Sequence, residues 1–342
     1  MAVFDGWSYE EITTPTVDYY SLFEHGMGRS QAHRAFRFTD ADGRLLALRP
    51  DVTSGVARAA VTIFAERERP LRLCYAAPVF RQQPQSHVEW RRESTQTGCE
   101  LIGANTSVAD MEVLAIASEI LQKLGLGGKY QITLNDVGVF AGLASRQALD
   151  EASRDDVRRI VDSRNAADLE RFLAQRGLAP EERQSLAQLT RLSGKRETLE
   201  RARRVISNAD SSEALDRLDR LWTIIESLDL TARFEIDLGD VARLDYYTGL
   251  TFNVYVDGAA VRVGNGGRYD GLTAAFGKAE PAVGFVLDLD ALTAVLLAQD
   301  ADARQSHESG RQSSLTTNGD PSLLFREARR KRAEGERVFV KP

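Results

Sequence analysis

Three polar stretches of the sequence carry residue types that could bind a charged ligand. The first reads LRPDVT over residues 48–53, where an expected strand runs into an expected helix. Asp51 or Thr53 could cap that helix, because short polar side chains accept hydrogen bonds from the first turn. Alternatively, their carboxylate and hydroxyl could face a cleft. Position alone leaves both interpretations open.

The second stretch covers residues 79–100. Alternate side chains of a strand point to the same side, so Ser94, Gln96, Gly98 and Glu100 should share one face of the expected strand. Gln96 and Glu100 are poor core residues, so this face is either wet or holds a polar ligand. Gly98 between them indicates that something approaches the backbone.

The third stretch combines RLDYYTG at 243–249 with GNGGRYDGL at 264–272. A run of glycines lets a ligand come close to the backbone, with charged and aromatic side chains beside it. The alternative is a hairpin followed by a tight turn. Spacing alone assembles no Ser/His/Asp set, no glycosidase-like acidic pair and no metal site. We therefore predict no catalytic residue, no metal and no cofactor.

The elements expected around these stretches indicate an antiparallel α+β fold. Asp42-Gly43 and Asp257-Gly258 are hairpin signals, and Gly125 stands where a helix should end. Strands are expected at 9–15, 36–40, 44–50, 71–80, 130–134, 234–238, 250–256 and 260–263. Helices are expected at 53–65 and from Ser107, and a last strand and helix at 282–297. The sequence lacks the glycine patterns of a parallel nucleotide-binding sheet.

Composition divides the chain into a core and two additions. Residues 144–228 are rich in Arg, Glu, Asp, Ala and Leu, which favours a helical insertion with solvated charged faces. The core would then comprise 1–143 and 229–298. Residues 299–342 are expected to form a flexible linker and a remnant C-terminal segment. The basic run at 326–332 is typical of a solvated helix, although contact with RNA or a partner is the alternative.

Bulk composition is that of an ordinary globular protein, with 43% hydrophobic residues and a formal net charge of -6. The acidic balance removes the general electrostatic argument for nucleic-acid binding, although a local basic face could still suffice. Cys74 and Cys99 are expected to be buried and reduced. The sequence shows neither a signal peptide nor a membrane-spanning run, which predicts a cytoplasmic protein.

The three stretches together resemble class II aminoacyl-tRNA synthetases, and among them histidyl-tRNA synthetases. LRPDVT is similar to that family's LRPExT, Arg81 with QTGCELIG (96–103) to its motif 2, and LDYYTG (244–249) with GGRYDGL (266–272) to its two histidine-specific signatures. Pro15 fits the motif 1 proline. The resemblance covers about residues 4–297 and implies an antiparallel sheet flanked by helices. It also implies a set of histidine-binding residues, namely Asp51, Thr53, Arg81, Gln96, Glu100, Tyr247 and Tyr269.

Several residues depart from the synthetase pattern, and two of these departures remove a cation that adenylation needs. Ala291 replaces the motif 3 arginine, and Asp288 adds a negative charge where a glycine is expected. The arginine before GLDYY falls on Ala242, with Arg243 displaced by one position, and Gln83 replaces a motif 2 glutamate. Losing one such charge partner typically slows a reaction about 100- to 1000-fold. We therefore expect no useful adenylation. The chain also looks too short for the family's anticodon-binding domain, and Met1 lies almost at the first strand.

A pocket that keeps its ligand and loses its chemistry predicts a sensor. The LRPDxT, LDYYTG and AVGFxLDLDxL-like (282–292) segments resemble the synthetase-like regulatory subunits of ATP phosphoribosyltransferase. That resemblance implies a non-catalytic subunit that is required by the short-form catalytic subunit for the first step of histidine biosynthesis. It also implies feedback inhibition by L-histidine and a homodimer within a hetero-oligomer, without nucleic acid or membrane. The alternatives are a histidyl-tRNA synthetase or a fragment of one, and a stand-alone histidine-binding or scaffolding protein.

Overall fold

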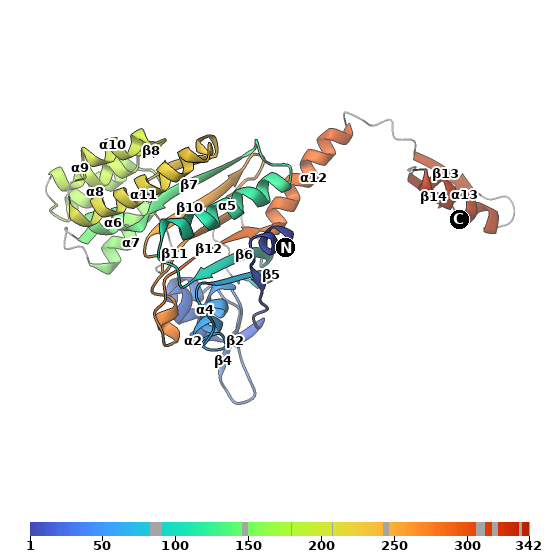
Figure 1. Cartoon of the computed structure of the whole chain (residues 1–342), viewed down its shortest axis with the longest axis horizontal. Helices are drawn as coiled ribbons and strands as arrows, with labels where there is room; N and C mark the ends of the chain where they lie inside the picture. Colours follow the sequence, from blue (N-terminus) through green and yellow to red (C-terminus); the bar gives the residue numbers. More distant parts are fainter. Residues whose placement is uncertain are drawn as a thin grey trace. The chain divides into compact units, whose positions relative to one another are not determined.

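A nine-stranded sheet runs through residues Met1–Leu292, the first of two compact units in this computed structural model (Figure 1). The second unit is Thr293–Pro342. The structure describes residues 1–82, 91–145, 150–178, 180–206, 208–241, 246–305, 312–316, 321–334 and 337–341.

The order of the strands in this sheet brings segments far apart in sequence together. From one edge to the other it comprises β1 (Glu10–Glu11), β5 (Leu71–Phe80), β6 (Glu93–Ile102), β12 (Ala282–Asp288), β11 (Gly264–Arg268), β10 (Leu250–Val256), β7 (Tyr130–Asp136), β9 (Phe234–Asp237) and β8 (Ser193–Gly194). The central strands from β5 to β7 pair antiparallel, while β1 pairs with β5, and β7 with β9, in parallel. This large, mainly antiparallel sheet with flanking helices confirms the predicted fold class.

Helix α5 (Ser107–Lys123) covers one face of the sheet. The Thr106 side chain caps its start by accepting from Ala109 N, and Gly125 follows its end with a left-handed φ of 76°. Glu112 of α5 accepts from Arg72 of β5 and from Tyr9. The short helix α1 (Ala2–Gly6) also contacts α5.

The other face of the sheet carries helix α4 (Thr53–Val61). Its residues Val56 and Ala60, with Val52 just before its start, form one buried cluster with Leu73 and Tyr75 of β5. Beside α4 lies a small antiparallel sheet with order β2 (Val17–Tyr19), β4 (Leu45–Leu48) and β3 (Arg37–Thr39). Helices α2 (Tyr20–Met27) and α3 (Arg29–Ala32) pack with it around the fully buried Ala47. The hairpin predicted around Asp42-Gly43 is thus confirmed.

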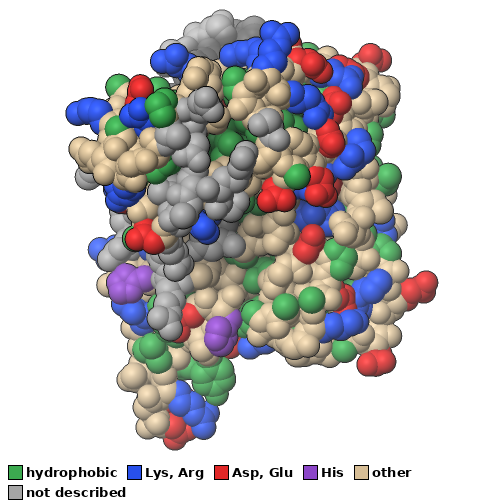
Figure 2. Space-filling view, turned by 90° about the vertical axis from the view of Figure 1, so that its left-hand side faces the viewer, with side chains coloured by type: hydrophobic (Ala, Val, Ile, Leu, Met, Phe, Trp, Pro, Cys, Tyr) green, Lys and Arg blue, Asp and Glu red, His purple; other side chains and the backbone are tan. Residues whose placement is uncertain are grey.

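Helices predominate between β7 and β9 and gather beyond that edge of the sheet (Figure 1). They are α6 (Val137–Ser145), α7 (Glu151–Asp162), α8 (Ala166–Gln175), α9 (Pro180–Leu189), α10 (Glu197–Arg203) and α11 (Ala209–Ser227), followed by the 3-10 turn η1 (Thr231–Arg233). Strand β8 joins this region to the main sheet through its pairing with β9. On the face seen in Figure 2, positive and negative side chains are interspersed. Such interspersion is typical of solvated helix faces.

The partner of β10 differs from the prediction. We expected residues 260–263 to pair with 250–256, but these residues form a loop and the glycine-rich β11 (Gly264–Arg268) pairs instead. The prediction was wrong because glycine was treated as the end of a strand. Here its lack of a side chain is what lets the strand fit, because a Cβ on Gly266 would lie 2.4 Å from the carbonyl oxygen of Gly284. The turn η2 (Thr273–Phe276) follows.

The two cysteines are buried and free, as expected. Cys74 and Cys99 are direct cross-strand partners of β5 and β6 on the face that α5 covers. Burial raises the pKa of the Cys74 thiol to about 11 and also raises that of Cys99. Both thiols therefore stay protonated near neutral pH and are poor nucleophiles.

The second unit contains a strand that composition did not reveal. After α12 (Leu289–Gln305), which spans the division between the units, β13 (Gln312–Thr316) pairs in parallel with β14 (Arg337–Lys341), and α13 (Pro321–Ala333) connects them. Residues 312–316 were expected to belong to a flexible linker. The basic helix was expected, and Arg330 pairs there with Glu327 and Glu334, as on a solvated face. In the described part of the chain, no helix is long and apolar enough to span a membrane.

Candidate functional site

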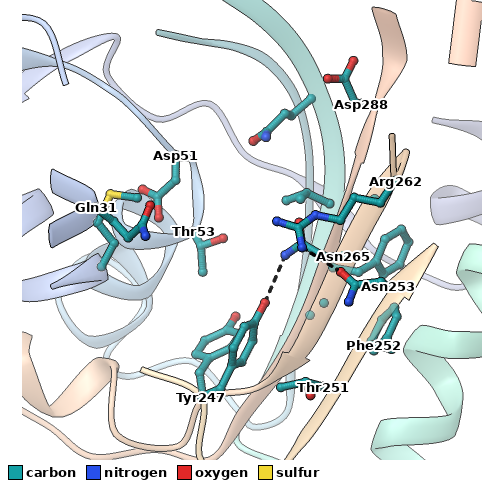
Figure 3. A pocket seen from close by; sticks show the side chains of 18 of the residues that line it. Gln31, Asp51, Thr53, Tyr247, Thr251, Phe252, Asn253, Arg262, Asn265 and Asp288 are labelled. Carbon is teal, nitrogen blue, oxygen red and sulfur yellow. Dashed lines mark hydrogen bonds between the residues drawn. The ribbon is translucent and has the colours of Figure 1, made fainter. Parts of the chain in front are cut away.

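A pocket of about 350 Å³ opens on the α4 side of the main sheet. Its walls come from α2 and α3, the start of α4, and strands β6, β10, β11 and β12. Figure 3 shows Asp51 and Thr53 on one side, Asn253, Asn265 and Arg262 on the other, and Tyr247 between them. The structure brings together all the residues predicted to bind histidine, which are Asp51, Thr53, Arg81, Gln96, Glu100, Tyr247 and Tyr269.

Strand β6 forms part of the pocket floor, and its polar face is buried rather than exposed to solvent. Gln96 is 7% exposed and Glu100 1% exposed, so the alternative of a solvated strand face is wrong. Gly98 lies between them because a Cβ there would stand 2.2 Å from the carbonyl oxygen of Phe285 on β12 and 2.9 Å from the Tyr75 hydroxyl. The predicted close approach to this glycine therefore comes from the protein itself.

Glu100 accepts three side-chain hydrogen bonds at the pocket floor. Its Oε1 accepts from Thr53 Oγ1 at 2.8 Å and from the Tyr75 hydroxyl at 3.1 Å, and its Oε2 accepts from the Tyr269 hydroxyl. Burial raises the pKa of Glu100 to about 7, and the three hydrogen bonds oppose that rise. Thr53 is therefore a partner of Glu100, and no side chain caps α4 at Val52.

Asp51 contributes both to the helix and to the pocket. Its Oδ2 accepts from the Ser54 hydroxyl at 3.1 Å in the first turn of α4. Its Oδ1 is buried and finds no hydrogen-bond donor in the described part of the chain, and the same holds for Gln96 Oε1. Buried acceptors without donors are destabilising by about 1–3 kcal/mol each. A ligand that carries N–H donors, such as an ammonium group or an imidazole, would satisfy both oxygens.

Tyrosine rings form the apolar part of the wall. The rings of Tyr246 and Tyr247 lie 4.8 Å apart, and Tyr246 meets Tyr269 edge to face at 5.8 Å. The Tyr247 hydroxyl accepts from Asn265 Nδ2 at 3.2 Å. Flat aromatic walls with hydroxyl groups at their edge suit a small polar ring.

Several polar residues of the opposite wall were not among those predicted from the sequence. Asn253 of β10 and Asn265 of β11 are direct cross-strand partners, and the Asn253 amide donates to Asp240. Arg262 donates to Asn253 Oδ1 at 3.2 Å. Asparagine is unfavourable within strands, and its presence at 253 was the available signal.

Two of the positions that depart from the synthetase pattern, Ala291 and Asp288, lie in the described part of the chain. Ala291 stands in the first turn of α12, where its N–H donates to the Asp288 carboxylate at 2.9 Å, and Asp288 also lines the pocket. Burial raises the pKa of Asp288, of Asp51 and of Asp240. Ala242, Arg243 and Gln83 lie outside the described residues. At neutral pH, buried carboxyl groups beside the pocket favour a ligand with N–H donors and disfavour a polyphosphate.

The raised pKa of Glu100 predicts a pH-dependent stability. Below pH 4.5, its ordinary pKa, the carboxyl is protonated in both the folded and unfolded states. As pH rises towards 7, the unfolded state ionises first, so the folded protein loses stability relative to a Glu100→Gln variant. The expected relative loss is about 3 kcal/mol between pH 4.5 and 8. Urea unfolding of both proteins at these pH values measures it, and parallel pH profiles would contradict it.

Comparisons with known proteins agree on one family. A family model described as histidyl-tRNA synthetase matches residues 1–292. The ATP phosphoribosyltransferase regulatory subunit of Moorella thermoacetica is 37% identical over 98% of this chain and 85% of that protein. The protein of the same name from Geobacter sulfurreducens is 35% identical over 86% of this chain and 67% of that protein.

A solved structure gives the same result. It is described as an ATP phosphoribosyltransferase regulatory subunit/histidyl-tRNA synthetase from Bacillus halodurans, and it matches with a TM-score of 0.78 and 30% identity. The match covers 99% of this chain and 86% of that one. The chain therefore belongs to the histidyl-tRNA synthetase family, among the relatives that are named ATP phosphoribosyltransferase regulatory subunits.

Proposed function

We propose that this protein is a non-catalytic regulatory subunit of ATP phosphoribosyltransferase that binds L-histidine in the pocket around Glu100. The observation that carries the proposal is the pair of buried acceptors, Asp51 Oδ1 and Gln96 Oε1, which have no donor among the residues that the structure describes. They stand beside a carboxylate and tyrosine hydroxyls that suit an imidazole and an ammonium group. The names of the relatives supply the enzyme that would be regulated.

The contacts suggest how histidine would lie. Its ammonium group would donate to Asp51 and Gln96, where acceptors without partners remain. Its imidazole would lie against the tyrosine rings and reach the Glu100 carboxylate, which already collects hydroxyl donors. These groups come from several elements, so binding would tie the start of α4, β6 and the tyrosine-bearing segments together.

Feedback inhibition follows from this arrangement if the complex has two states. Histidine can bias the complex only by binding one state more tightly than the other. In our proposal the partner is the short-form catalytic subunit, which needs this chain for the first step of histidine biosynthesis. Histidine in the pocket would favour the inhibited state of that complex.

A homodimer within the hetero-oligomer is part of the proposal. On the small sheet, Tyr19 and Phe38 both lie opposite Leu46 and so share one face with Val17. These three side chains are 45%, 41% and 41% exposed, respectively. Contiguous exposed apolar side chains commonly mark contact surfaces. Sedimentation velocity of the purified chain tests the dimer, and the mass of a single chain would argue against it.

Isothermal titration of the purified chain with L-histidine and, separately, with ATP tests the function of the pocket. Histidine should bind and ATP should not, because the pocket offers acceptors and buried carboxyl groups. A histidine-sensitive gain of activity on mixing with the short-form catalytic subunit tests the partner. Tight ATP binding, or formation of histidyl-adenylate, would instead favour a histidyl-tRNA synthetase. Histidine binding without any effect on the transferase would favour a separate histidine-binding protein.

A further inference from the structure

Arg262 enters the pocket from the wall opposite Asp51 (Figure 3). It lies in the loop between β10 and β11 and precedes Val263, whose backbone is hydrogen-bonded to two neighbouring strands. Val263 N donates to Val254 O at 2.8 Å, and Val263 O accepts from Asp288 N at 2.7 Å. These bonds hold the end of the loop against the sheet at the rim of the pocket.

A series of hydrogen-bonded polar side chains orients the Arg262 guanidinium. Its Nη1 donates to Asn253 Oδ1 at 3.2 Å, and Asn253 Nδ2 donates to Asp240. Asp240 also accepts from Thr133 Oγ1 at 3.3 Å. The Asn253 amide thus links Arg262 to Asp240, and the charge of Arg262 also lowers the pKa of Asp240 against the larger effect of burial. A guanidinium has five N–H donors in a planar fork, so one group can hold Asn253 and also face a ligand.

The positive charge of Arg262 acts on a side chain inside the pocket. Burial raises the pKa of Tyr247 to about 12, and the positive charge of Arg262 opposes that rise. Tyr247 lies between the two walls, so the cation acts at the place where a ligand would lie.

The two walls are complementary to the two ends of an α-amino acid. Asp51, Gln96 and Glu100 offer acceptors on one side, and no described residue donates to Asp51 Oδ1 or Gln96 Oε1. Arg81 is on the Asp51 side, where its charge lowers the pKa of Asp51 against the larger effect of burial. A carboxylate that extends away from the acceptors would approach Arg262, and arginine binds carboxylates in a two-pronged geometry.

We propose that Arg262 binds the carboxylate of the amino-acid ligand and makes the pocket select histidine over the corresponding amine. This inference rests on the proposed function of the pocket. It adds a specificity-determining residue from a loop that belongs to none of the three polar stretches.

The test is isothermal titration of the full chain with L-histidine and with histamine, which lacks the carboxylate. Arg262→Gln should weaken histidine binding by about 10- to 100-fold, the usual effect of losing a charged hydrogen bond. It should leave histamine binding within about 2-fold of the wild type. Arg262→Lys, which keeps the charge without the planar fork, should bind histidine with an affinity between those of the wild type and Arg262→Gln. Arg220→Gln, an exposed arginine of α11 that does not line this pocket, is the matched control.

Each other outcome overturns the inference in a distinct way. Equal losses for both ligands would mean that Arg262 only supports the pocket structure, and thermal melting of the free variants would show that directly. An unchanged affinity for histidine would exclude the contact. A histidine-specific loss in Arg81→Gln but not in Arg262→Gln would place the carboxylate on the opposite wall. If the wild type bound neither ligand, the proposed function itself would fail.

Discussion

Replacing Glu100 with alanine is expected to weaken L-histidine binding by about 30-fold or more. Glu100 is 1% exposed and collects the hydroxyl groups of Thr53, Tyr75 and Tyr269. Its removal takes away a charged acceptor for the ligand and leaves three buried donors without their partner. Truncating one member of a buried charged contact typically lowers affinity by about 2–5 kcal/mol. Isothermal titration of the variant at pH 8, where the wild-type carboxyl is ionised, measures the loss.

A partly buried glutamate, Glu112, provides the control for this variant. Glu112 accepts from Tyr9 and Arg72 on the α5 side of the sheet, away from the pocket. Glu112→Ala should lower stability and leave histidine affinity unchanged. Glu100→Gln keeps the size of the side chain and should lose less affinity than Glu100→Ala. Wild-type affinity in Glu100→Ala would remove this residue from the binding site.

Gly284→Ala is expected to destabilise the fold by about 3 kcal/mol and to abolish histidine binding. A Cβ at this position would lie 1.8 Å from Glu100 Oε2 and 2.5 Å from the carbonyl oxygen of Cys99. A side chain could move away, but the Cys99 carbonyl belongs to β6, so β6 and β12 would have to separate locally. Added atoms in a packed region typically lower stability by about 1–3 kcal/mol. Urea unfolding and histidine titration of the variant measure the two effects.

Two further variants sharpen the Gly284 experiment. Gly271→Ala is the matched control, because a Cβ there would meet no atom within 4 Å, and it should be close to neutral. Adding Glu100→Ala to Gly284→Ala should recover part of the lost stability, because it removes the nearer of the two clashes. Full stability of the single Gly284→Ala variant would show that β6 and β12 accept a Cβ between them without loss of stability.

Local sequence patterns predicted most of the central elements. The predicted ranges of β5 and β10 match the structure at both ends, since each is a continuous strand pattern bounded by turns. Helix α5 begins at the predicted Ser107, and Gly125 stands just after it. The motif resemblance was sufficient to select the pocket residues, because each motif carries its residues at fixed spacing.

Other features depended on partners that are distant in sequence. The role of Thr53 is decided by Glu100, 47 residues later, and Tyr269 reaches the same carboxylate across 169 residues. A single stretch read alone could not distinguish a helix cap from a pocket residue. Likewise, β13 exists because β14 pairs with it, and residues 312–316 by themselves look like a polar linker.

The sequence by itself determined the kinds of chemistry available to this protein. The motifs supply two carboxylates, an amide and two tyrosines that we expect to bind histidine, and they place Ala291 where the resemblance expects a cation for adenylation. The tertiary structure alone decided that Gln96 and Glu100 are buried, that no described residue donates to Asp51 Oδ1 or Gln96 Oε1, and that Arg262 lies across the pocket from Asp51. The physical reason is that burial and hydrogen-bond partnership depend on how separate strands pack, whereas residue type and spacing are local properties of the chain.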